Sequence, residues 1–169
     1  AAVEAIQQGL ELAAASRDRY QEVRARVYLG LAQLEAKMPP ARALELARSA
    51  TELAKQMPMP VGEVYGLAVQ GLALSVQGLD KEAAKLAGRA VERQRTSNHP
   101  EGSEQILHIF ASLSEKAGKL DDARDAIRKA HAEVEAKAAK LRDENLRDSY
   151  LGARVPSAIQ SDYRRLVES

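Results

Sequence analysis

Apolar residues recur at every third or fourth position through long stretches of this chain. Val23, Val27, Leu31 and Leu34 show the spacing, which places all four side chains on one face of an α-helix. Prolines, glycines and short polar segments interrupt the pattern, and such residues end helices. Eight helices are therefore predicted, over residues 1–15, 18–37, 40–57, 61–77, 80–96, 100–117, 121–147 and 157–167.

The segments between the predicted helices are short. We expect Gly78 and Gly118 to cap the C-termini of two helices, because glycine adopts the left-handed conformation of such a cap at little cost. We expect Asp80 and Asp121 to cap the N-termini of the helices that follow. Connections this short make successive helices antiparallel neighbours.

The chain also repeats itself. When the sequence is shifted by 40 residues, Gly78 and Gly118 align at a turn, with Met38 in the first copy. The same shift aligns Ala43, Ala83 and Ala123, then Ala50, Ala90 and Ala130, then Val27, Leu67 and Leu107, and also Pro60 with Pro100. A fixed period of this length indicates stacked helical hairpins. Proteins of that kind usually bind other proteins.

The spacing within each copy has a physical meaning. The turn residue precedes two alanines that lie on one face of the second helix, where small side chains let the helices approach closely. This arrangement resembles the tetratricopeptide repeat (TPR) family over about residues 20–134. The matching residues are Gly71, Gly78, Ala83 and Ala90, then Ala111, Gly118, Ala123, Ile127 and Ala130, and less completely Gly30, Ala43 and Ala50.

The resemblance implies an all-α fold, a right-handed solenoid of antiparallel helix hairpins with about three and a half repeats and a C-terminal cap. The array would span residues 1–134, with a truncated first hairpin at 1–15 and capping helices at 135–169. Its repeats would cover about residues 20–57, 60–96 and 100–134. The bulky aromatic residues of the family signature are largely missing. A HEAT- or armadillo-like solenoid is the alternative fold, because its period is nearer to 40.

The length of the repeat is informative in itself. The usual TPR period is about 34 residues, whereas the longer period here is similar to that of the long arrays in large bacterial signalling proteins. The segment 146–151, followed by Val155 and Pro156, resembles the tail that ends such arrays. A polar terminal cap, which any repeat array needs, explains the same segment.

The resemblance also implies a binding groove. In TPR arrays the first helix of each hairpin lines a concave surface that holds a partner. The positions expected to line it are Tyr28, Ala32, Glu35, Tyr65, Ala68, Leu72, Val76, Gln105, His108 and Ser112. These residues are mostly small or apolar, which suits an extended or helical peptide. A clamp for a terminal carboxylate is not expected, because tyrosine, alanine and leucine stand where such clamps carry lysine and asparagine.

Composition excludes several other functions. Apolar residues make up 45% of the chain and aromatic residues only 4%, with no cysteine. Disulfides, thiol catalysis and zinc–thiolate sites are therefore excluded. No apolar run is long enough to span a membrane and no signal peptide is visible, so we expect a cytoplasmic location without a membrane partner.

Charge gives one further candidate. The formal net charge is +1, and the best candidate for a basic stripe consists of Lys81, Lys85, Arg89 and Arg93 on one predicted helix. A nucleic-acid partner would need such a stripe. A solvated outer helix face explains it more simply, so no nucleic-acid partner is expected.

Catalysis is not expected either. His99 lies in a turn, and the pair His108 and Glu104 is typical of an ordinary contact on a helix surface. The chain contains no nucleophile elbow and no phosphate-binding loop. Two acidic pairs, at 121–122 and 143–144, are typical of helix starts and surface charges. We therefore expect no enzyme activity, no cofactor and no metal.

These observations together predict a scaffold that binds a protein or peptide partner in its concave groove, and that forms part of a larger protein. The alternative hypothesis is an intramolecular regulatory or sensor arm of a multidomain bacterial signalling enzyme. The signalling-type tail and the truncated first hairpin suggest this alternative.

Overall fold

The computed structural model describes residues 2–97 and 102–169, and these residues are almost entirely helical, with no strand among them. The predicted all-α class is confirmed. The elements are α1 (Ala2–Ala15), α2 (Arg19–Glu35), α3 (Pro40–Gln56), α4 (Pro60–Val76), α5 (Asp80–Ser97), α6 (Ser103–Lys116), α7 (Leu120–Ala138), α8 (Glu144–Gly152), α9 (Arg154–Tyr163) and the π-helix η1 (Arg164–Glu168). The predicted turn at His99 and Pro100 lies outside the described residues.

The first five predicted helices match α1 to α5 closely, but the continuous helix predicted over 121–147 is wrong. The helix α7 ends at Ala138, and α8 starts again at Glu144. Asp143 causes the restart, because its carboxylate accepts a hydrogen bond from the backbone N–H of Leu146 at 3.0 Å and so caps α8. The guanidinium of Arg147 donates to the carbonyl of Leu141 at 2.8 Å, which fixes the intervening turn.

Left-handed residues end the helices of each hairpin. Gly78 and Gly118 have φ of +79° and +76°, which confirms both as C-terminal cap residues. In the first hairpin the left-handed residue is Lys37, with φ of +55°, so the assignment of Met38 to this position is wrong. The N–H of Met38 instead donates to the carbonyl of Gln33 at 2.9 Å and closes the turn.

The two aspartates expected to cap helices lie inside them. Asp80 is the first residue of α5, and its carboxylate accepts a hydrogen bond from the Ser75 hydroxyl at 3.0 Å. Asp121 is the second residue of α7, whose N-cap is Lys119. The capping prediction is wrong for both. A carboxylate in the first turn still stabilises the helix, because it faces the positive end of the helix dipole.

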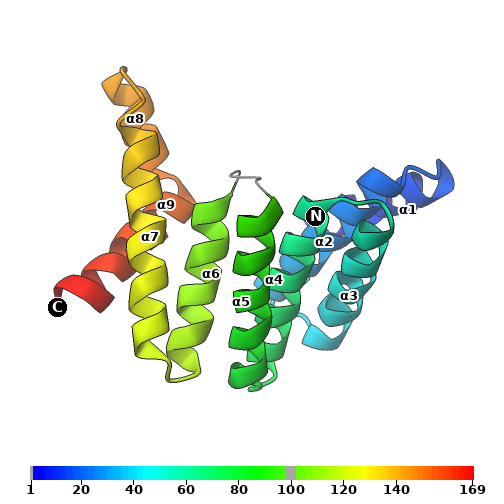
Figure 1. Ribbon diagram of the computed structural model, residues 1–169. Helices are drawn as coiled ribbons and strands as arrows, with labels where there is room; N and C mark the ends of the chain where they lie inside the picture. Colours follow the sequence, from blue (N-terminus) through cyan, green and yellow to red (C-terminus); the bar gives the residue numbers. More distant parts are fainter. Residues whose placement is uncertain (1, 98–101) are drawn as a thin grey trace. The chain divides into compact units, whose positions relative to one another are not determined.

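The helices form two compact units, Ala1–Pro100 and Glu101–Ser169. In the first unit, α1 to α5 pack as consecutive neighbours, and α4 contacts α2 as well as α3 and α5 (Figure 1). The helix α4 is therefore the centre of this unit. The predicted boundary between repeats and cap, after residue 134, falls inside the second unit.

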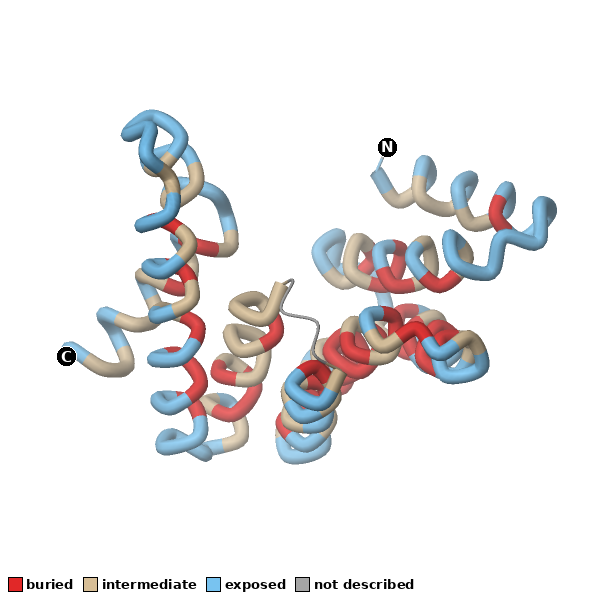
Figure 2. The backbone as a smooth tube through the Cα atoms, turned by 45° about the horizontal axis from the view of Figure 1, so that its top comes forward, coloured by how far each residue is buried: buried red, intermediate tan, exposed pale blue. Residues whose placement is uncertain are grey.

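Small residues allow the close packing. The alanines aligned by the 40-residue shift, on α3, α5 and α7, are all fully buried. On α4, a Cβ atom added at Gly66 would lie 2.3 Å from the hydroxyl of Thr51, and one added at Gly62 would lie 2.6 Å from Val23. The backbone of α4 thus touches its neighbours directly, and in Figure 2 the buried positions lie where helices face one another.

Two polar interactions tie the first unit together. The buried hydroxyl of Thr51 donates to the carbonyl of Ala47 at 2.8 Å and accepts from the amide of Gln70 on α4 at 2.8 Å. Arg93 on α5 binds both carboxylate oxygens of Glu63 on α4, at 2.8 and 2.9 Å. These contacts fix the register of α4 against α3 and α5.

The second unit is built on the α6–α7 hairpin. Its core contains Ile127, Ala130 and Val134 of α7 together with Ile159 of α9, and all four are fully buried. Both α9 and η1 pack on α7. The outward side of α9 is polar, with exposed Ser157 and Ser161 among others, as expected for a segment that covers the end of a repeat.

Candidate functional site

The helix α4 leaves one accessible line of residues. Val61, Tyr65, Leu72 and Val76 follow one another at helical spacing on the same face, and all four are partly or well exposed, with Val76 at 61%. Most other residues of α4 are buried. Glu63 and Ser75 are partly exposed as well, but these four residues form an uncharged line, which is unusual for a solvent-facing one.

The corresponding line on α2 depends on where the turns fall. Because Lys37 occupies the position of Gly78, residues of α2 and α4 correspond at a separation of 41 rather than 40. The residues of α2 that match the α4 line are therefore Tyr20, Arg24, Leu31 and Glu35. We call these eight residues the inner line of the first unit. The double proline at 39–40, which lengthens the first turn, is the sequence signal for this shift.

The shift changes the place of two residues expected to line the groove. Tyr28 corresponds to Val69, whose side chain approaches Gly30 of α2. Tyr28 therefore lies on the side of α2 that faces away from α4, where it is 52% exposed. Ala32 corresponds in the same way to Ala73, which is fully buried, but Ala32 itself is partly exposed.

The other expected groove residues of the first unit are divided. Tyr65, Leu72, Val76 and Glu35 belong to the inner line. Ala68 has no exposed surface, so it offers nothing to a partner. Tyr65 is partly buried against the core, and its ring joins the inner line to the packing of α2 and α3.

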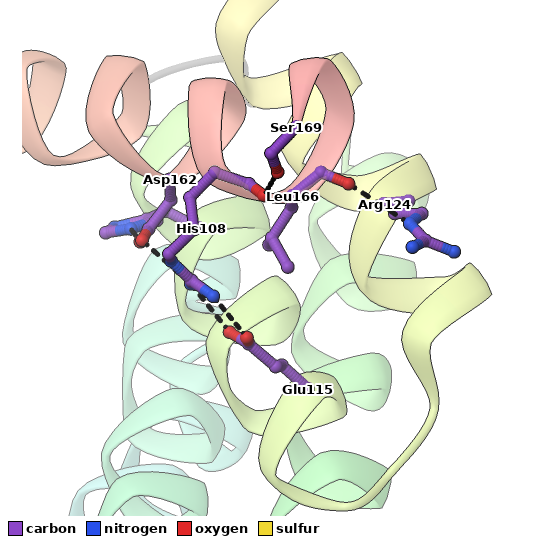
Figure 3. A network of polar contacts seen from close by, with 7 residues as sticks. His108, Glu115, Arg124, Asp162, Leu166 and Ser169 are labelled. Carbon is purple, nitrogen blue, oxygen red and sulfur yellow. Dashed lines mark hydrogen bonds and ion pairs between the residues drawn. The ribbon is translucent and has the colours of Figure 1, made fainter.

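In the second unit, the predicted groove residues lie on α6. Gln105 and Ser112 are partly buried. His108 binds the carboxylate of Asp162 on α9, with 2.8 Å between Nε2 and Oδ2. Figure 3 shows His108 and Asp162 close to Glu115, which forms an ion pair with Arg165. His108 is thus part of an internal contact with the C-terminal segment.

Arg165 is the centre of this polar network. Its guanidinium binds Glu115 on α6 and, at 3.0 Å, Asp162 on α9. Hydrogen bonding to Arg165 lowers the pKa of Glu115 below its ordinary value. Burial raises the pKa of Asp162, but hydrogen bonds from His108 and Arg165 outweigh it and leave that pKa lowered. Both carboxylates therefore stay ionised and hold the C-terminal segment on α6.

The basic stripe of α5 is weaker than its sequence indicates. Lys81, Lys85 and Arg89 are exposed, but Arg93 is neutralised by Glu63. Three exposed cations on one helix make a small surface for a phosphate backbone.

The remaining expected pairs have other partners. Glu104 binds Lys137 of α7, with 2.6 Å between Oε2 and Nζ, rather than His108.

Within residues 2–97 and 102–169, no three histidine or acidic side chains are grouped closely enough to hold a metal ion. Among the same residues, no helix is long and apolar enough to cross a membrane.

No protein-family model matches the sequence, and no curated protein matches it.

Proposed function

We propose that the chain is a TPR-like helical-repeat scaffold without catalytic activity, and that the inner line of its first unit binds a protein or peptide. One observation carries the proposal. One accessible face of α4, a helix largely buried among its neighbours, carries Val61, Tyr65, Leu72 and Val76, and none of these four is charged.

The packing of α2 and α4 supports this proposal. Both are first helices of their hairpins, and they contact each other. Among the described residues no comparable contact joins α3 to α5. An inner layer of first helices and an outer layer of second helices is the arrangement expected of a solenoid with a concave side. A helical or extended segment between the lines of α2 and α4 would bury apolar surface from both.

Peptide selection and substitution test the proposal. Peptides selected from a displayed random library against the full chain would be labelled, and their Kd measured by fluorescence anisotropy. We expect Leu72→Glu and Val76→Glu to weaken binding at least tenfold, because each places a charge in an apolar contact. Leu12→Glu is the matched control, since Leu12 is also apolar and 71% exposed but lies on α1.

A second pair of variants tests the register. Tyr20 and Tyr28 lie on the same helix with almost equal exposure, at 51% and 52%. We expect Tyr20→Glu to weaken binding and Tyr28→Glu to leave it unchanged. Equal affinities for the Leu72, Val76 and Leu12 variants would reject the inner line as the binding surface.

A further inference from the structure

The α2 part of the inner line carries a cation, Arg24, that has no partner among the described residues. Arg24 is exposed, and its side chain forms no hydrogen bond or ion pair within the described part of the chain. It lies one helical turn from Tyr20, which is also exposed. Arginine and tyrosine are among the residues enriched at energetically dominant positions of interfaces.

The acidic residues nearest to Arg24 in α2 have other roles. Asp18 caps the helix by accepting from the N–H of Gln21 at 3.1 Å. Glu22 binds Arg26. Glu35 stands at the far end of the same line, roughly 16 Å away at 1.5 Å per residue, which exceeds the screening length of about 8 Å at physiological salt. The charge of Arg24 is therefore available to an incoming group.

Beyond Arg24 the inner line offers apolar side chains. Leu31 follows at roughly 10 Å along the helix axis, and the neighbouring line of α4 offers Leu72 and Val76. A single cation followed by apolar side chains, with Glu35 only at the far end of the line, fits a peptide that carries a carboxylate about 10 Å from its apolar anchor. A nucleic-acid strand fits poorly, because it presents closely spaced phosphates and needs several cations in a row.

We propose that the partner of the inner line is an acidic-apolar segment of a protein, with a carboxylate bound by Arg24 beside Tyr20 and an apolar side chain seated between Leu31 and Leu72. This inference rests on the proposed function, since it names the chemistry of the partner at the same surface. The carboxylate is recognised by charge-assisted hydrogen bonds, which arginine forms in a fixed fork geometry.

Three labelled probes test the inference on the full chain. The first is a short peptide that alternates glutamate clusters with leucines at helical spacing. The second has lysine in place of every glutamate, and the third is a single-stranded DNA oligonucleotide. We expect the glutamate peptide to bind most tightly, and Arg24→Gln to weaken it roughly tenfold, the loss of one charge-assisted contact. Arg48→Gln is the matched control, because Arg48 is an exposed arginine on α3.

Each result has a defined meaning. Both proposals are supported if the chain binds the glutamate peptide more tightly than the lysine peptide, and if Arg24→Gln and Leu72→Glu each weaken that binding. Binding that depends on Leu72 but is equal for the glutamate and lysine peptides overturns the acidic partner and leaves the proposed surface standing. Binding that is indifferent to Leu72 rejects the surface. Tighter binding of the oligonucleotide that depends on Arg24, or no binding of the glutamate peptide, also overturns the inference.

Discussion

Replacing Gly66 by alanine tests the close packing of the first unit. The added Cβ would lie 2.3 Å from the hydroxyl oxygen of Thr51 and 3.2 Å from the carbonyl oxygen of Ala47. Real Cβ atoms essentially never lie within 3.0 Å of another atom, so the first contact is impossible, and the second is tight and involves backbone. The Thr51 hydroxyl must therefore move, although it joins Ala47 to the amide of Gln70 through two hydrogen bonds of 2.8 Å.

The expected loss of stability is the sum of three effects. Overpacking a core costs about 1–3 kcal/mol, and a weakened buried hydrogen bond costs about 1 kcal/mol. Alanine has a higher helix propensity than glycine, which offsets about 1 kcal/mol of this loss. The net loss is about 2 kcal/mol, which lowers the melting temperature of a unit of this size by about 10 °C.

Thermal unfolding followed by circular dichroism measures this loss. Gly9→Ala is the matched control, because an added Cβ at Gly9 of α1 meets nothing within 4 Å, and we expect it to leave stability unchanged or slightly raised. The double variant with Thr51→Ala should be more stable than the sum of the two single changes, since removing the hydroxyl makes room. A Gly66→Ala chain as stable as the original would refute the close approach of α3 and α4.

Further predictions concern turns, an ion pair and a buried hydroxyl. Lys37→Gly should raise the unfolding free energy by about 1 kcal/mol and Gly118→Ala should lower it by about 1 kcal/mol, because only glycine adopts a positive φ without strain. Urea titrations measure both changes, and changes of the opposite sign would contradict this prediction. Hydrogen bonding to Arg93 lowers the pKa of Glu63 below its ordinary value of 4.5, so the ion pair stabilises fully above that pH and is lost as the pH falls below it. Glu63→Gln should therefore lower stability by about 1 kcal/mol at neutral pH but not at pH values well below 4.5, and a difference that persists in acid would contradict the assignment. The buried hydroxyl of Tyr150 has no hydrogen-bond partner among the described residues, so Tyr150→Phe should be neutral or stabilising by up to about 1 kcal/mol; a clear loss in the same titration would contradict this.

Periodicity predicts the helices well because each one buries a single face against its neighbours. The alanines aligned by the 40-residue shift and the left-handed glycines follow from the same pattern, since small residues are needed where two helices cross and glycines where the chain reverses. The break between α7 and α8 was missed because residues 139–143 contain neither glycine nor proline. The capping by Asp143 and the contact of Arg147 with Leu141, which determine the break, become visible only in three dimensions.

The candidate site was less predictable than the fold. A shift of one residue in a helix turns a side chain by about 100°, so placing Met38 rather than Lys37 at the turn matched Tyr28 and Ala32 to different residues of α4 than the structure does. The pairing of His108 with Asp162 joins residues far apart in the sequence, and no local pattern predicts a contact of that kind.

The most direct test of the binding surface is amide chemical-shift mapping by NMR. A selected peptide would be titrated into the isotope-labelled chain, and the shifted amides located on the structure. We predict that the largest shifts cluster around the inner line, at Tyr20, Leu72 and Val76 on α2 and α4. Shifts concentrated on the outer helices α3 and α5, with α2 and α4 unchanged, would contradict the account.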